Sequence, residues 1–259
     1  MDNGRAGKST RCSGNCRSTS GNSSSRRVET PSGTGSAKLC PWTPDVGALN
    51  MSAELFEAIE SHQLDRLRVL LSGGAEPNAI KREWPSWLAL HAAIDALEQG
   101  ASIDAVVLLL RHGANPNGLD PSRDTPPLLM ALFRHQPEAA RMLLAVGADP
   151  NVVGDEGDSP LRWCVEHGDL EMAATLLRCG AAKTIDGAGG PSGMTALGRA
   201  ASQLNIAMLK LLLQAGADPK ALDADRLTAS ERLPPRSSAE PEAWDIAAVL
   251  LGQGSSAPG

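Results

Sequence analysis

The sequence predicts an all-α solenoid built from pairs of short helices, because one helix-ending pattern recurs along the chain. A Gly-Ala dipeptide stands at residues 74–75, 113–114, 147–148, 180–181 and 216–217, with spacings of 39, 34, 33 and 36 residues. A leucine pair precedes each of them, at residues 70–71, 109–110, 143–144, 176–177 and 212–213. A recurrence every 20–50 residues or so indicates stacked copies of one supersecondary unit.

The unit is most complete between Arg141 and Ala182. Ser159 suits a helix N-cap because its hydroxyl accepts from free backbone N–H groups, and Pro160 suits the first helical position because it lacks an N–H. Gly168 is expected to end this first helix, and a second helix is expected from Leu170 to Arg178. Gly180 then follows at the place where a helix commonly closes with a left-handed residue.

Two helices this short cannot enclose a core, so the apolar face of each unit must be buried by its neighbours. That face is predicted to consist of Leu161, Cys164, Leu170, Ala173, Leu176 and Leu177. The unit resembles the ankyrin repeat, with the pattern D-x-x-G-x-T-P-L-H-x-A-A-x-x-G-H…LL-x-x-G-A-D-P-N, and the resemblance extends roughly from Ser52 to Gly254. It implies a solenoid of helix-turn-helix units joined by hairpin loops.

The predicted domain comprises six units, with boundaries at 51–80, 81–119, 120–153, 154–186, 187–221 and 222–254. The first lacks the start of the motif and is expected to cap the array. The second has four more residues between Leu90 and Ile103 than the fourth has at the same place, which predicts a longer first helix. The sixth is degraded: Pro234-Pro235 should stop its first helix, and a last helix is expected over Ala243–Leu251.

The first fifty residues are rich in Ser, Gly and Arg and carry about +4, which leaves about −10 for the rest. Such a composition predicts a disordered tail, and residues 255–259 are expected to be disordered too. Either the tail is a genuine extension or translation starts at Met51, with Ser52 as a helix N-cap. A chain starting at Met51 should be as stable as the full chain. We expect no secretory signal, no membrane span and a cytoplasmic protein.

Catalysis and cofactor binding have little support in the sequence, so we predict a non-enzyme with no cofactor and no metal. Cys12 and Cys16 could form half of a metal site, but no second ligand pair follows at a usable spacing. Lys8 lies in a Gly-Lys-Ser triplet that lacks the rest of a phosphate-binding loop. No Ser, Cys or Asp is placed to form a triad with a histidine. The acidic body disfavours nucleic acid.

The histidines and Trp163 have structural interpretations. His91 matches the motif histidine, which in the ankyrin family hydrogen-bonds between repeats. His62 and His135 occupy a turn position usually held by glycine. His167 falls where the family varies freely, so a contact role remains open. Trp163 is expected to pack between repeats.

The resemblance implies that a protein partner binds to the hairpin tips and the exposed positions of the first helices. On this chain the predicted contact residues are Trp84, Trp87, Asp95, Arg123, Phe133, Arg134, Asp155, Glu156, Asp158, Glu166 and His167. Exposed tryptophans would be typical interface anchors. The alternative is that the longer second unit folds over and buries Trp84 and Trp87.

The predicted function is therefore non-catalytic protein–protein binding by a monomer. The alternative is a secreted or regulatory effector-type adaptor whose basic tail carries targeting or modification sites. The carboxylates of Asp155, Glu156, Asp158 and Glu166 are expected to attract a basic partner, with an association rate that falls as salt is added.

Overall fold

The computed structural model describes residues 46–122, 124–155 and 157–252. All the described residues belong to one compact unit. The expectations for the tail, Cys12, Cys16 and residues 255–259 therefore lie outside the described residues. The helices are α1 (Val46–Glu60), α2 (Leu64–Ser72), α3 (Ala89–Glu98), α4 (Asp104–Arg111), α5 (Pro127–Phe133), α6 (Pro137–Ala145), α7 (Pro160–His167), α8 (Leu170–Arg178), η1 (Ala181–Thr184), α9 (Ala196–Ser202), α10 (Ile206–Gln214), η2 (Arg236–Ser238) and α11 (Pro241–Leu250).

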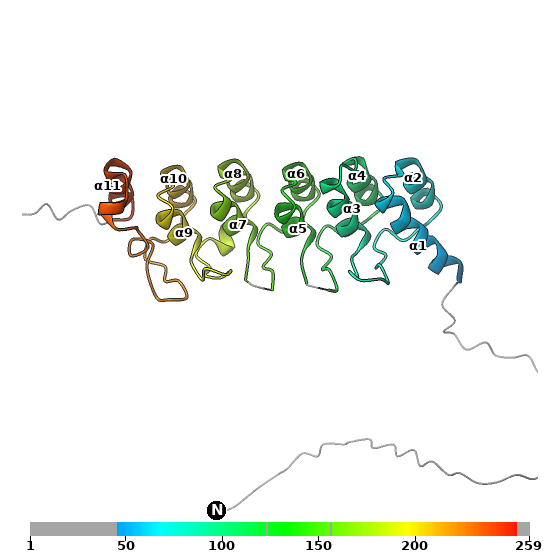
Figure 1. The fold of residues 1–259 in the computed structure, drawn as a ribbon, viewed down its shortest axis with the longest axis horizontal. Coiled ribbons are helices and arrows are strands. Elements are labelled where there is room, and N and C mark those ends of the chain that lie inside the picture. The colour runs from blue at the N-terminus through cyan, green and yellow to red at the C-terminus, as the bar shows by residue number, and fades with distance from the viewer. Residues whose placement is uncertain (1–45, 123, 156, 253–259) are drawn as a thin grey trace, which may run out of the picture. The chain divides into compact units, whose positions relative to one another are not determined.

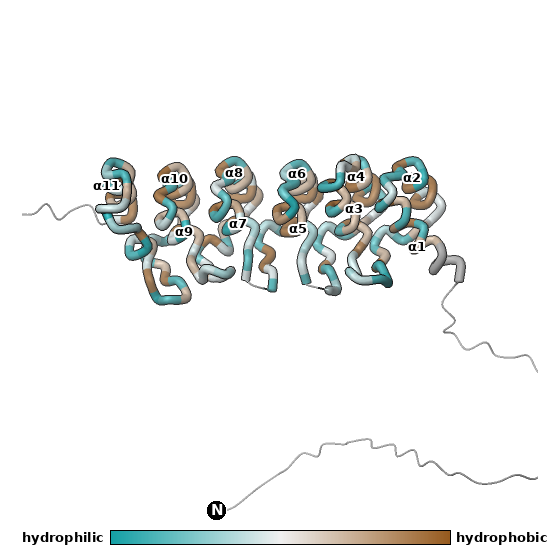
Figure 2. Tube along the Cα trace, viewed as in Figure 1, coloured by the Kyte–Doolittle hydropathy of each residue, from teal (hydrophilic) through white to brown (hydrophobic). Residues whose placement is uncertain are grey.

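The helix pairs of the described part stand side by side in a row, which confirms the predicted all-α solenoid (Figure 1). The first helices pack in sequence, α1 on α3, α3 on α5, α5 on α7 and α7 on α9. Apolar residues concentrate in the helices (Figure 2). The largest side chains with almost no exposure are mainly leucines of both helix layers, among them Leu90, Leu128, Leu161 and Leu176. Each repeat thus buries most of its neighbour's apolar face, but Leu170, which was predicted to belong to that face, is 39% exposed, so this part of the prediction is wrong.

The local signals of the fourth repeat are confirmed. The Ser159 hydroxyl accepts from the backbone N–H of Arg162, and α7 starts at Pro160. Gly168 ends α7 in a left-handed conformation with φ 69°. The second helix, α8, has the predicted bounds. Gly180 follows with φ 94°, as its position after the leucine pair predicts.

An asparagine ladder links the repeats, a feature that the sequence analysis missed. Asn78, Asn117 and Asn151 each donate a side-chain N–H to the backbone carbonyl of the glycine that closes the next repeat. Each of these side chains also accepts a backbone N–H from that next repeat. The link from the fourth to the fifth repeat keeps only the second half of this pattern, because Asp186 accepts from the Asp218 N–H and carries no side-chain donor.

Both ends of the array depart from the predictions. Helix α1 begins at Val46, so Ser52 lies inside a helix and the expected N-cap at Ser52 is wrong. Residues 229–232 form turns, and no α-helix lies between α10 and α11, so the sixth repeat has no first α-helix for Pro234 and Pro235 to stop. The final helix α11 starts two residues earlier than expected, with Pro241 in its first turn.

The longer second repeat behaves partly as predicted. Its first helix, α3, has 10 residues, compared with 8 in α7, and the remaining extra residues form the turn before α4. Among the described residues, no helix is both long and apolar enough to cross a bilayer.

Candidate functional site

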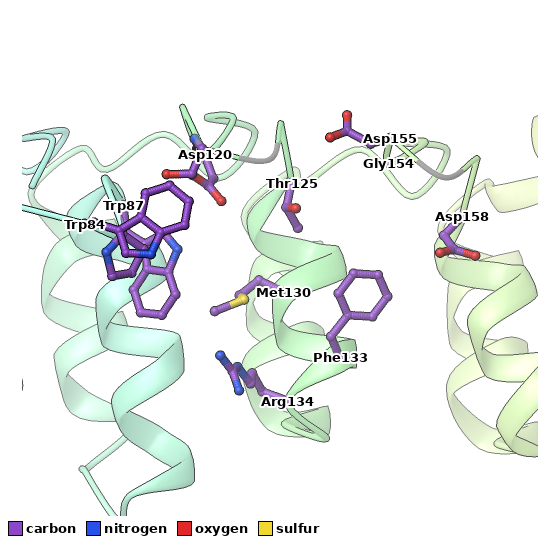
Figure 3. A pocket seen from close by; sticks show the side chains of 12 residues that line it. Trp84, Trp87, Asp120, Thr125, Met130, Phe133, Arg134, Gly154, Asp155 and Asp158 are labelled. Carbon is purple, nitrogen blue, oxygen red and sulfur yellow. Dashed lines mark hydrogen bonds between the residues drawn. The ribbon is translucent and has the colours of Figure 1, made fainter. Parts of the chain in front are cut away.

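A groove of about 620 Å³ crosses the loops of the second, third and fourth repeats and the first helix of the third, α5 (Figure 3). Its lining includes six of the eleven predicted contact residues: Trp84, Trp87, Phe133, Arg134, Asp155 and Asp158. They come from three repeats, and the stacking of those repeats brings them to one surface. The sequence analysis did not assign Asp120, Met130 and Gly154, which also line the groove.

Two tryptophans of the second repeat form one wall of the groove. Trp84 is 75% exposed, whereas Trp87 is partly buried and packs against the core. The backbone of this loop is held in place, since the Lys81 N–H donates to the Trp87 carbonyl and the Ser86 N–H donates to the Ser122 hydroxyl of the third repeat. The alternative in which the second repeat buries both rings is therefore wrong for Trp84 and partly right for Trp87.

Helix α5 supplies Met130 and Phe133 to the groove, and Arg134 follows as the C-cap of this helix (Figure 3). Phe133 is 40% exposed. The Arg134 guanidinium lies 2.6 Å from an Asp95 oxygen and 2.9 Å from a Glu98 oxygen, both on α3. Burial raises the pKa of Asp95 although Arg134 is close, and the nearby carboxylates add to this rise. The Arg134 guanidinium therefore forms ion pairs with both the Asp95 and the Glu98 carboxylate.

The two described aspartates of the fourth-repeat loop differ in their surroundings. Asp155 is exposed and has no ion-pair or hydrogen-bond partner among the described residues. The Asp158 carboxylate lies 3.0 Å from the buried Arg162 guanidinium, which also donates to the Gly157 carbonyl. A Cβ at Gly189 of the next repeat would stand 2.7 Å from that guanidinium, so glycine is needed there. Asp158 therefore stabilises the loop as well as lining the groove.

Glu166 and His167 do not line this groove. The Glu166 carboxylate lies 2.8 Å from the guanidinium of Arg199 in the next repeat. This pairing and that of Asp158 reduce the free negative charge that the sequence predicted for this edge. The His167 ring stacks on Trp163 with centroids 4.0 Å apart. Arg123 and Glu156 lie outside the described residues.

Trp163 packs between repeats, as predicted. It is partly buried against the core, and its ring centroid lies 6.5 Å from that of Phe133 and 5.2 Å from that of His135, both in the third repeat. His135 has φ 52°, in keeping with its turn position. Phe133 thus belongs both to the groove and to this aromatic cluster.

His91 makes the predicted link between repeats. Its Nε2 lies 2.8 Å from the Thr125 carbonyl oxygen, which can only accept, so Nε2 carries the proton. Burial lowers the pKa of His91, despite the opposing effects of this hydrogen bond and of Asp120. The ring is therefore neutral at pH 7 and acts as a fixed structural donor behind the groove.

The described residues contain no cluster of three or more His, Cys, Asp or Glu side chains that could hold a metal ion. Burial raises the pKa of the Cys164 thiol, which disfavours the reactive thiolate. The groove thus combines exposed aromatic rings, partly paired charges and a backbone held by hydrogen bonds.

Comparison with known proteins agrees with this architecture. A family model described as ankyrin repeats (3 copies) matches residues 55–153 and 128–223. An ankyrin repeat protein of fowlpox virus (strain NVSL) is 34% identical over 167 residues, 63% of this chain and 36% of that protein. The chain thus spans about a third of the length of this viral relative.

Two further proteins match over much of their own length. The cyclin-dependent kinase 4 inhibitor B of Rattus norvegicus is 32% identical over 124 residues, 48% of this chain and 90% of that protein. The crystal structure of the ankyrin repeat domain of Bcl-3, a member of the IkappaB protein family, superposes with a TM-score of 0.59 and 28% identity, covering 74% of this chain and 80% of that one. The chain belongs to the ankyrin repeat family.

Proposed function

We propose that this chain binds a protein partner in the groove formed by its second, third and fourth repeats, without catalysing a reaction. Ankyrin repeats are generally protein–protein interaction modules, and one relative is named as an inhibitor of a kinase. The observation that carries the proposal is the exposure of two aromatic rings, Trp84 at 75% and Phe133 at 40%, that line one groove spanning three repeats.

These exposed rings are expected to supply much of the free energy of binding. An exposed indole loses the most water-accessible apolar area when a partner covers it, and Trp is among the residues that dominate interface energies. The loop that carries Trp84 is already ordered by the Ser86–Ser122 hydrogen bond, so little ordering entropy is lost on binding. The alternative function, an effector-type adaptor acting through the basic tail, concerns residues outside the described ones.

Affinity capture from the source organism with wild-type and variant chains tests the proposal. Trp84→Ala and Phe133→Ala should each reduce recovery of the partner, because both remove exposed ring area from the groove. Val69→Ala is the matched control, since Val69 is 71% exposed on α2 and does not line the groove. Thermal unfolding should show that all three variants are folded. Equal recovery with all chains would refute groove binding.

A further inference from the structure

The charges around the groove point to the chemistry of its occupant. Three carboxylates line it, those of Asp120, Asp155 and Asp158. Two more, Asp95 and Glu98, lie behind Arg134. Against these five carboxylates stand two guanidinium groups, those of Arg134 and Arg162, so the described groove has an excess of negative charge.

Neither of these arginines is available to the exposed rings. Arg134 is held by its two carboxylates on α3, and Arg162 is buried with Asp158 and the Gly157 carbonyl. In the described part of the chain, the guanidinium of Arg236 lies over the ring of Trp244. Both residues are far along the sequence from the groove. Among the described residues, therefore, no cation stacks on Trp84 or Phe133, and a partner can supply one.

We propose that the groove binds an extended, basic segment of the partner and that an arginine of this segment lies against Trp84 or Phe133 and pairs with Asp155. The inference rests on the proposed function and adds the chemistry of the occupant. Arginine fits better than lysine, because its planar guanidinium stacks on rings and pairs with carboxylates at the same time. Asp155 fits the role because it is exposed and has no ion-pair partner among the described residues.

A second copy of this chain fits poorly. Residues 46–252 carry about −10 at neutral pH, so two copies would repel each other. An extended segment also suits the shape of the groove. Adjacent repeats lie about 10 Å apart, so a groove across three of them accommodates roughly six extended residues, at about 3.3 Å each. Aliphatic neighbours of the arginine would contact Met130 and Trp87.

Selection from a random eight-residue peptide library displayed on phage tests this inference with the full-length chain as bait. Peptides that bind the wild type and lose binding to the Trp84→Ala/Phe133→Ala chain are groove-dependent. Their enriched sequences should contain arginine, flanked by aliphatic residues. Groove-dependent peptides without basic residues would overturn the inference while supporting the proposed function. A selection that yields no groove-dependent peptide would count against both.

Synthetic versions of the best peptide then isolate the guanidinium. Fluorescence polarisation should show binding on the order of tenfold weaker when arginine is replaced by citrulline, which has a similar shape but no charge. Asp155→Asn should weaken the arginine peptide about threefold and leave the citrulline peptide unchanged. Glu138→Gln on α6 is the matched control, because it removes one exposed carboxylate outside the groove and should have no effect. Equal weakening by both substitutions would contradict a specific pairing with Asp155.

Discussion

Replacing Arg162 by methionine should destabilise the array strongly, although the side chain carries a charge. The residue is 4% exposed, and its guanidinium joins the Gly157 carbonyl to the Asp158 carboxylate. Methionine keeps much of the aliphatic volume but leaves the carbonyl without this donor and the carboxylate without its counter-ion. An unsatisfied buried acceptor costs about 1–3 kcal/mol.

The magnitude follows from how much solvent reaches each partner. Removing one member of a fully buried pair costs about 3–5 kcal/mol. The Asp158 side chain retains 20% exposure, so water can partly solvate its charge after the substitution. We therefore expect a loss of about 2–4 kcal/mol in the free energy of unfolding, in the middle of the range of about 1–5 kcal/mol that these two costs span.

Guanidinium chloride unfolding of the full chain measures this loss. The matched control is Arg141→Met, which breaks an ion pair with Glu171 whose two side chains are 41% and 78% exposed. That control should change the free energy of unfolding by no more than about 0.5 kcal/mol. Equal midpoint shifts for the two variants would refute the reasoning, because burial of the pair would then make no difference.

Three other substitutions or conditions should change the free energy of unfolding. Gly180→Val should cost on the order of 1 kcal/mol from backbone strain alone, since φ is 94° and no atom lies within 4 Å of the added Cβ; an unchanged unfolding midpoint would exclude this. Asn151→Ala should cost about 1 kcal/mol, measured in the same way, because it removes the hydrogen bonds to Gly180 and Lys183. His91 is protonated more readily in the unfolded chain, because its pKa is lowered in the folded one, so wild-type stability should fall as the pH drops below about 6.5. His91→Gln should reduce that fall between pH 7 and pH 5, and parallel stability–pH curves for the two chains would contradict it.

The sequence predicted those parts of the fold that depend on local signals. Ser159, Pro160, Gly168 and Gly180 act within a few residues of themselves, and each has its predicted place in the structure. The role of His91 followed from the family resemblance. The asparagine ladder could have been found too, because Asn78, Asn117 and Asn151 each stand four residues after a helix-closing glycine.

Other features depended on packing between repeats and could not be predicted from a pattern along the chain. The pairing of Asp158 with Arg162 depends on the glycine backbone of the fifth repeat, which leaves room for the guanidinium. The different exposures of Trp84 and Trp87 result from the path of one loop. The start of α1 at Val46 was missed because the composition of the tail concealed the helix before Met51.

Site-specific photo-crosslinking tests the central claim, that a partner occupies the groove, most directly. A benzophenone amino acid in place of Trp84 should yield a covalent adduct with the partner upon irradiation in extracts of the source organism, and the adduct should disappear when the enriched arginine peptide is added in excess. The same amino acid in place of Val69, equally exposed but on α2, should yield no such adduct. An adduct from position 69 with none from position 84 would place the interface on the opposite helix layer and contradict the account.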